Sequence, residues 1–363
     1  MSSFRCARAA HFLHLIASML VRIGAVAALW SAGLGVTAAQ GIADLARDQS
    51  AARNQRIVAA AKAEGTLTFY TSIPEKDMAV LAADFEARYG IKVNVWRGST
   101  QKVLQRIVAE AQGRRFDFDV VDISSPELEA LHREKLLQQV YSRHHADLVP
   151  GTMPAHAEWA PQFLSVFVQA YNSSKIRKED VPKRYEDLLN PRFRGAIGIE
   201  ANDQEWLCGV MHQIGDEAGR KFFRELRAIN GMSVRSGHSL LTNLVVSGEV
   251  PLALTVYSYM AEQAKARGAP VDWFAIEPAI GRSNGIALSR RSPHPNAALL
   301  FYEYMLSDAQ PLMARMNYLP ASAKVASPLG TLRVKYLDSG AVLDEREACQ
   351  RSWEELIENR AAK

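Results

Sequence analysis

The segment "TLTFYTSIPEKD", residues 66–77, indicates how this chain folds. Its apolar run from Leu67 to Tyr70 predicts a short buried strand, and two hydroxyl side chains, Thr71 and Ser72, follow at once. A proline and several charged residues come next, as is typical of the start of a helix. Apolar side chains then recur at helical spacing, which predicts a helix over 75–89. The segment therefore predicts a strand, a polar turn and a helix in succession.

The same arrangement follows twice more along the chain. Strands predicted over 91–96 and 118–123 each precede a polar turn and a further helix. Strands that alternate with helices predict a parallel sheet with right-handed crossovers. The carboxyl ends of parallel strands lie together at one edge, where open α/β sheets bind ligands. We therefore predict one side of a binding site from the side chains of the three turns: Thr71, Ser72, Arg97, Ser99, Thr100, Ser124 and Ser125.

The hydroxyl pairs of these turns have two explanations. One hydroxyl in each turn is expected to cap a helix, which is the ordinary role of serine and threonine there. Capping does not require a second hydroxyl, and helix N-termini offer free N–H groups and partial positive charge to a ligand. Arg97 would favour an anionic ligand, and its alternative role is that of an ordinary surface arginine.

The second half of the chain repeats this pattern. The extended apolar run Phe163 to Val168 predicts a crossing into a second lobe. The segment 271–310, which is extended over Phe274 to Pro278 and continues into the strand "NGIALS", predicts the return crossing. Strands over 196–200 and 252–256 again lead to polar residues. Two crossings between two α/β lobes predict a clamp that closes about a hinge. The candidate ligand-binding residues of this lobe are Arg235, Ser236, Tyr257 and Tyr259, with Asp203 and Glu205 as further candidates at a helix start.

Composition excludes several classes of function. The chain has 363 residues, enough for two domains, and its hydrophobic content of 48% is that of a globular protein. Its net charge of +4 depends on the first 39 residues, which hold three arginines and no acid. The remainder has 40 basic and 39 acidic residues, so nucleic-acid binding has no electrostatic footprint.

The N-terminus predicts a secretory signal over residues 1–39. Arg22 precedes the apolar run Ile23 to Val36, and the small residues of "TAAQ" then offer a cleavage site. The run is shorter than the roughly 20 residues of a membrane-spanning helix, so we expect cleavage rather than anchoring. The segment from Met19 is a complete signal by itself, which leaves Met1 and Met19 as alternative starts.

Neither cysteines nor motifs indicate an enzyme. Cys208 and Cys349 lie beyond the signal, and an oxidising compartment would permit a disulfide, but spacing alone does not pair them and separate buried thiols are favoured. The sequence has no CxxC, HExxH, Walker or GxSxG motif. His238, two residues after Ser236, is the one candidate base for a hydrolytic alternative.

Six longer segments carry a family resemblance: "AAAKAEGTLTFYTS", "FEARYGIKV", "YNSSKI", "DLLNPRFRGAIG", "VVSGEVPLALTVYSY" and "NAALLFYEYMLSDAQ". Over residues 55 to about 330 the chain resembles periplasmic solute-binding proteins of ABC importers, specifically their ferric-ion-binding branch. The resemblance implies a type II periplasmic binding protein, with two α/β lobes of mostly parallel sheet joined by two crossover strands. It implies lobes formed by 55–163 plus 276–320 and by 164–275 plus 321–363.

The resemblance also implies a function. It predicts a monomeric, non-catalytic receptor in the periplasm that captures a solute between its lobes and delivers it to a membrane permease. No cofactor is expected, and ferric iron would be carried as cargo. A periplasmic sensor for a signalling kinase needs the same clamp and stays open as an alternative.

The metal ligands of the ferric branch are only partly present. The histidine position of that branch falls at Pro74 and its acid position at Ile123, while its tyrosine pair corresponds to Tyr257 and Tyr259. Fe(III) prefers several anionic oxygen ligands, so two phenolates would need help from a chelating anion. The ligand therefore stays open between ferric iron with such an anion and a phosphate, phosphonate or carboxylate solute.

Overall fold

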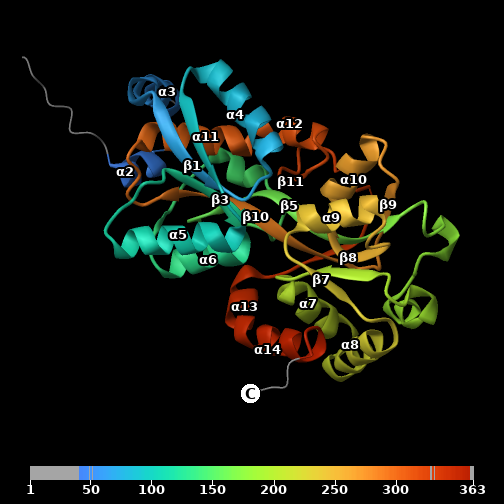
Figure 1. Ribbon diagram of the computed structural model, residues 1–363. Helices are drawn as coiled ribbons and strands as arrows, with labels where there is room; N and C mark the ends of the chain where they lie inside the picture. The colour runs from blue at the N-terminus through green and yellow to red at the C-terminus, as the bar shows by residue number, and fades with distance from the viewer. Residues whose placement is uncertain (1–40, 49, 51, 328, 331, 360–363) are drawn as a thin grey trace, which may run out of the picture. The chain divides into compact units, whose positions relative to one another are not determined.

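The computed structural model describes residues 41–48, 50, 52–327, 329–330 and 332–359, and the signal predicted over 1–39 lies outside them. One mixed sheet organises this part of the chain, with the central strand order β2-β1-β3-β10-β5-β8-β6-β7 (Figure 1). The strands are β1 (Thr66–Thr71), β2 (Lys92–Arg97), β3 (Val120–Ser124), β4 (Leu137–Gln138), β5 (Ala160–Asn172), β6 (Ile197–Glu200), β7 (Ser233–Arg235), β8 (Leu252–Tyr257), β9 (Val271–Phe274), β10 (Ala279–Ser289), β11 (Leu319–Pro320) and β12 (Val334–Tyr336).

The first half of the sheet contains the three strand–helix units that the sequence predicts. β1 pairs in parallel with β2 on one side and with β3 on the other. The helices that follow these strands are α4 (Glu75–Tyr89), α5 (Thr100–Gln112) and α6 (Ser125–Arg133). The helix predicted over 75–89 is confirmed with unchanged bounds, because Gly90 adopts the left-handed conformation, φ 70°, that ends it.

The second half of the sheet repeats this construction. β6 pairs in parallel with β7 and β8, and the predicted strands over 196–200 and 252–256 are confirmed as β6 and β8. The helices of this half are α7 (Gln204–Ile214), α8 (Asp216–Asn230), α9 (His238–Ser247) and α10 (Ser258–Ala266).

Two long antiparallel strands connect the halves. β5 pairs with β10 along its first part and with β8 and β9 along its last part, so the predicted first crossing is confirmed. The return crossing predicted within residues 271–310 is confirmed as β10. Phe274 still pairs with Gln169 of β5 inside the second half of the sheet, so the chain turns back only after this point.

Helices from early and late parts of the described chain cover the first half of the sheet. α3 (Arg53–Glu64) and α2 (Ile42–Arg47) pack against α11 (Pro295–Leu306), which is followed by α12 (Ala309–Arg315) (Figure 1). Phe301 of α11 contacts Phe69 of β1 edge-on, with ring centroids 5.0 Å apart. This packing buries the face of β1 that points away from α5 and α6.

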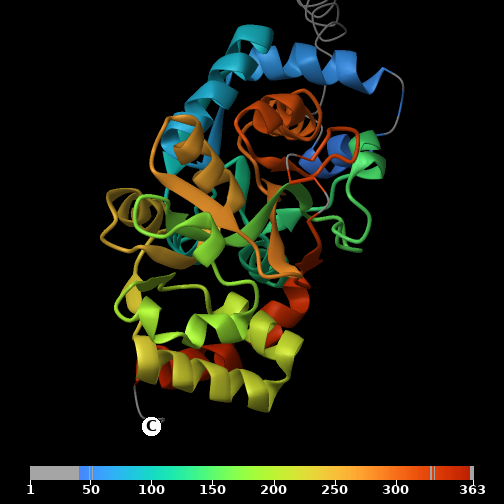
Figure 2. The same cartoon turned by 90° about the vertical axis from the view of Figure 1, so that its right-hand side faces the viewer.

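The C-terminal segment contacts both halves. β12 pairs with β10, α13 (Ser339–Asp344) packs on α6, and α14 (Arg346–Leu356) lies beside α7 and α8 (Figure 2). Two ion pairs reinforce the contact with α6, Arg346–Glu127 at 2.8 Å and Arg133–Asp344 at 2.6 Å.

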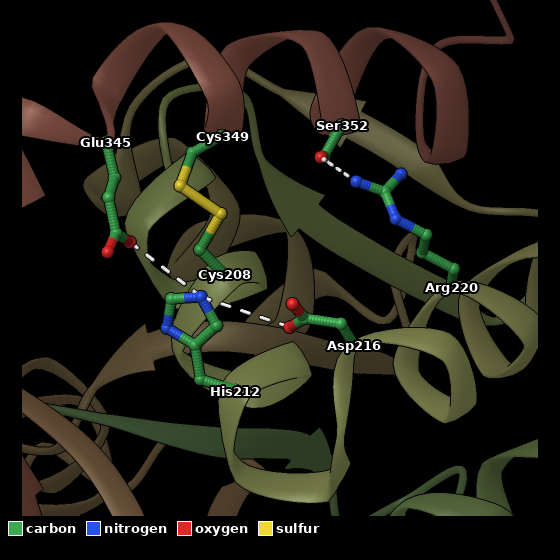
Figure 3. The surroundings of a disulfide bond; sticks show 7 residues. All are labelled: Cys208, His212, Asp216, Arg220, Glu345, Cys349 and Ser352. Atoms are coloured by element: carbon green, nitrogen blue, oxygen red, sulfur yellow. Dashed lines mark hydrogen bonds and ion pairs between the residues drawn. A yellow bond between two sulfur atoms is a disulfide. The ribbon is translucent and has the colours of Figure 1, made fainter.

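A disulfide joins α14 to α7. Cys208 and Cys349 are bonded, with their Cα atoms 5.8 Å apart, so the expectation of separate buried thiols is wrong (Figure 3). The pairing depends on how α14 docks against α7, and the 141-residue separation in sequence gave no indication of it. The bond fixes the end of the chain to the second half of the sheet.

None of the helices in the described ranges is long and apolar enough to span a membrane.

Candidate functional site

A cavity of about 380 Å³ lies between the two halves of the sheet, at the carboxyl ends of their parallel strands. This is the edge at which the sequence predicts ligand binding. We call the side chains that the first half contributes the first wall: Ser72, Arg97, Ser99, Thr100 and Ser124. We call those of the second half the second wall: Asp203, Ser236, His238, Tyr257 and Tyr259.

The first wall consists of hydrogen-bond donors. Ser99 caps α5 by accepting from the backbone N–H of Lys102 at 3.3 Å, as the capping explanation predicts. The same expectation is wrong for the other two turns, because α4 and α6 begin without a side-chain cap. The hydroxyls of Thr100 and Ser124 lie 3.2 Å apart and hold two neighbouring turns together. Arg97 is exposed at the end of β2 and has no ion-pair partner among the described residues, so its charge is available to a ligand.

Three predicted residues do not line the cavity. Thr71 is fully buried and its hydroxyl accepts from the backbone N–H of Ile73 at 3.0 Å, because it shares the core-facing side of β1 with Leu67 and Phe69. Ser125 is 1% exposed within the first turn of α6. Arg235 pairs instead with Glu249 at 3.1 Å.

Five helices of the described chain begin at the rim of this cavity: α5, α6, α7, α9 and α10. Their N-cap residues Ser99, Ser124, Asp203, Gly237 and Tyr257 all line it. Each helix start presents backbone N–H groups and partial positive charge. Together these N-termini favour a ligand with negative charge.

The second wall is aromatic and titratable. The rings of Tyr257 and Tyr259 stack with centroids 5.8 Å apart, and the ring of His238 lies 4.1 Å from that of Tyr257. His238 Nε2 lies 3.4 Å from Asp203 Oδ1. Burial opposes a charge on His238, but the carboxylates of Asp203 and Glu200 outweigh it and raise the pKa of His238 above its usual value.

Arg282 of the crossing strand binds the second wall, and no local sequence pattern predicted this. It lies on the crossing strand β10, lines the cavity, and donates hydrogen bonds to Glu205 and to the Tyr257 hydroxyl. Burial raises the pKa of Glu205, while the charge of Arg282 acts in the opposite direction. Only the fold brings these three side chains together, because they come from α7, β8 and β10.

The two candidate tyrosines are neutral in this arrangement. Burial raises the pKa of Tyr257 and of Tyr259 above the usual value for tyrosine, although Arg282 opposes the shift in both. The charge of Arg97 on the first wall opposes the raised pKa of Tyr259 as well. A metal ion would have to displace the phenolic protons before either side chain could serve as an anionic ligand.

Candidate metal ligands within the cavity lie on one side only. Glu200, Asp203 and His238 of the second half lie close enough together to share an ion, and the two tyrosines are adjacent. The first half contributes no carboxylate and no imidazole to the described lining. At the two positions where the ferric branch has ligands, Pro74 precedes α4 and Ile123 is fully buried in β3.

A second group of metal-binding residue types lies outside this cavity. It comprises Glu129, His132 and His156. Each histidine already has a carboxylate partner, His156 with Glu129 at 3.1 Å and His132 with Glu158 at 3.0 Å.

The chain belongs to the family of bacterial extracellular solute-binding proteins, whose model matches residues 119–331. The predicted resemblance to this class is thereby confirmed. The chain is 24% identical over 272 residues to the iron uptake protein A1 of Synechocystis, a match that covers 68% of this chain and 75% of that protein.

Solved structures of two other proteins show the same fold. The iron-bound HitA of Pseudomonas aeruginosa superimposes with a TM-score of 0.70 at 23% identity, covering 80% of this chain and 99% of HitA. The periplasmic binding protein AfuA of Actinobacillus pleuropneumoniae, solved with fructose-6-phosphate, gives a TM-score of 0.70 at 19% identity, covering 82% of this chain and 100% of AfuA. The predicted two-lobed α/β fold of type II periplasmic binding proteins is confirmed.

Proposed function

We propose that this protein is a periplasmic receptor that binds a small organic anion between two lobes and delivers it to the membrane permease of an ABC importer. The lobes of this proposal are 55–163 with 276–320 and 164–275 with 321–363. The receptor acts as a monomer without catalysis, and the signal over 1–39 directs its secretion. The relatives' names favour uptake over the sensing alternative.

The first wall is the observation that carries this proposal. It combines Arg97, which has no ion-pair partner in the described chain, with hydroxyls from three turns and the N-termini of α5 and α6. These groups donate hydrogen bonds or carry positive charge, and no acid of the first half lines the cavity among the described residues. Phosphate, phosphonate and carboxylate groups match such a surface because they accept several hydrogen bonds at once.

Isothermal titration calorimetry with a panel of phosphate esters, phosphonates and carboxylates tests the proposal. We expect Arg97→Ala to weaken binding of the best anion by roughly tenfold or more, because a charge-assisted hydrogen bond is lost. Arg97→Lys should retain much of the affinity. Arg351→Ala removes a 68% exposed arginine of α14 and serves as the matched control. Failure of the whole panel to bind, or equal binding of uncharged analogues, would contradict the proposal.

Ferric iron with an accompanying anion is a second candidate. The stacked pair of Tyr257 and Tyr259 on the cavity surface favours it, as do relatives named for iron. Fe(III) bound to either phenolate would produce a visible charge-transfer band when ferric citrate is added. Tyr257→Phe and Tyr259→Phe should each weaken that band. A colourless protein that binds iron-free anions in the same cavity would remove this candidate.

A further inference from the structure

The carboxylate of Asp203 is an incompletely used hydrogen-bond acceptor on the second wall. Asp203 lines the cavity and is only 1% exposed. Its Oδ2 atom is buried and has no hydrogen-bond partner among the described residues. A buried charged oxygen without a donor is costly, so a donor supplied by the solute would be stabilising.

The usual structural roles do not account for this oxygen. Asp203 occupies the N-cap position of α7, yet its side chain makes no capping hydrogen bond. His238 approaches the other oxygen, Oδ1, at 3.4 Å.

Glu200 does not have the same spare capacity. It accepts from the backbone N–H of Asn202 at 2.6 Å and from that of Gly237 at 2.7 Å. These bonds tie two turns of the second half together, which gives Glu200 a structural role. Asp203 is therefore the acid of this group with an oxygen left for a ligand.

We propose that the solute is bifunctional, with an anionic group against the first wall and a hydroxyl or ammonium group that donates a hydrogen bond to Asp203. This inference rests on the proposed function and adds a second recognition element to it. The two walls offer the complementary groups that such a solute requires. The first wall offers Arg97 and hydroxyls, whereas the second presents a carboxylate held in place by His238.

Matched ligands test this arrangement directly. Phosphoethanolamine and glycerol 3-phosphate carry the donor. Propyl phosphate is the donor-free counterpart of both, with a methyl group in place of the ammonium of the first and hydrogen in place of the two hydroxyls of the second. β-Alanine and butanoate form the corresponding carboxylate pair. For the headgroup that binds, we expect wild-type protein to bind the donor-bearing member at least tenfold more tightly in calorimetry. The stronger of phosphoethanolamine and glycerol 3-phosphate identifies the donor as ammonium or hydroxyl.

Variants then assign the preference to Asp203. Asp203→Asn and Asp203→Ala should reduce the preference, which is the ratio of the two affinities, to about twofold or less. Asp216→Asn, an exposed acid on α8, is the matched control and should leave the preference intact. Circular dichroism and thermal unfolding verify that each variant is folded. If one of the two Asp203 variants does not fold, the other one provides the test.

Three outcomes overturn the inference. Equal binding of donor-bearing and donor-free ligands to wild-type protein would overturn it but leave the anion receptor standing, provided that binding depends on Arg97. A preference that survives both Asp203 variants would overturn the assignment to this residue. Failure of these five ligands and of every other member of the anion panel to bind would remove both the inference and the proposed function.

Discussion

The two walls of the cavity are built from different kinds of sequence information. The first wall comes from three consecutive strand–turn–helix units, each of which places polar side chains at the end of its own strand. The second wall is assembled from residues distant in sequence, such as Asp203 and His238, and includes aromatic and titratable groups. The first wall thus provides a general anion-binding surface, and we expect selectivity to reside mainly in the second.

The largest predicted effect concerns the buried ion pair between Arg282 and Glu205. Arg282→Met would leave Glu205 buried without its counter-charge and should lower the free energy of unfolding by about 3–5 kcal/mol. Urea unfolding measures this change. The double variant Glu205→Gln/Arg282→Met should recover part of the loss because no buried charge remains unpaired. Equal stability of the wild type and the single variant would show that this ion pair does not stabilise the fold.

Removal of the disulfide should lower the stability of the fold and leave anion affinity nearly unchanged. Replacing both Cys208 and Cys349 with serine is expected to cost about 2–4 kcal/mol of unfolding free energy, because the unfolded chain loses a constraint. Anion affinity should change by less than about twofold, since neither cysteine lines the cavity between the two walls. Denaturant unfolding and calorimetry on the same samples measure both quantities. A large loss of affinity would instead show that the C-terminal segment shapes the walls.

Neighbouring hydroxyls on one turn provide a sharper comparison. Thr71→Val should destabilise the protein by about 1–2 kcal/mol, because it leaves the buried N–H of Ile73 without its acceptor, and should hardly affect binding. Ser72→Ala should do the reverse, since Ser72 lines the cavity. Paired unfolding and calorimetric measurements test both variants. Similar effects of the two substitutions would refute the separation of a structural role for Thr71 from a binding role for Ser72.

A smaller, pH-dependent effect is expected from the second wall. The folded-state pKa of His238 is raised, so its pairing with Asp203 stabilises the fold fully below the unfolded value of about 6.5. This contribution is lost as pH rises through the folded-state pKa, at about 1.4 kcal/mol per unit of pKa shift. The difference in free energy of unfolding between wild type and His238→Gln should be largest near pH 6 and should shrink as the pH rises to about 9. A constant difference across that range would contradict the assigned charge.

The sequence predicted the first wall better than the second for a physical reason. A strand end and a helix start are local features, so Ser72, Ser99 and Ser124 could be placed from neighbouring residues alone. Thr71 was misplaced because the alternation of β1 turns it toward the core, and the shared parity of Leu67, Phe69 and Thr71 was the available signal.

Long-range contacts set the limit of prediction. Arg282 lies within an alternating strand, and nothing near it in sequence reveals that Glu205 and Tyr257 meet it in space. The disulfide likewise depends on the docking of α14 against α7. Arg235 was predicted as a site residue because it stands at the end of a strand. In the fold it forms an ion pair with Glu249 and does not line the cavity.

A crystal structure of the protein with the tightest-binding member of the anion panel tests the central claim most directly. We predict that the anionic group lies within hydrogen-bond distance of the first wall, with Arg97 and at least one hydroxyl of Ser72, Ser99, Thr100 or Ser124 in contact. An anionic group bound only by the second half, or an iron ion held by Tyr257 and Tyr259 with no contact to the first wall, would contradict the account.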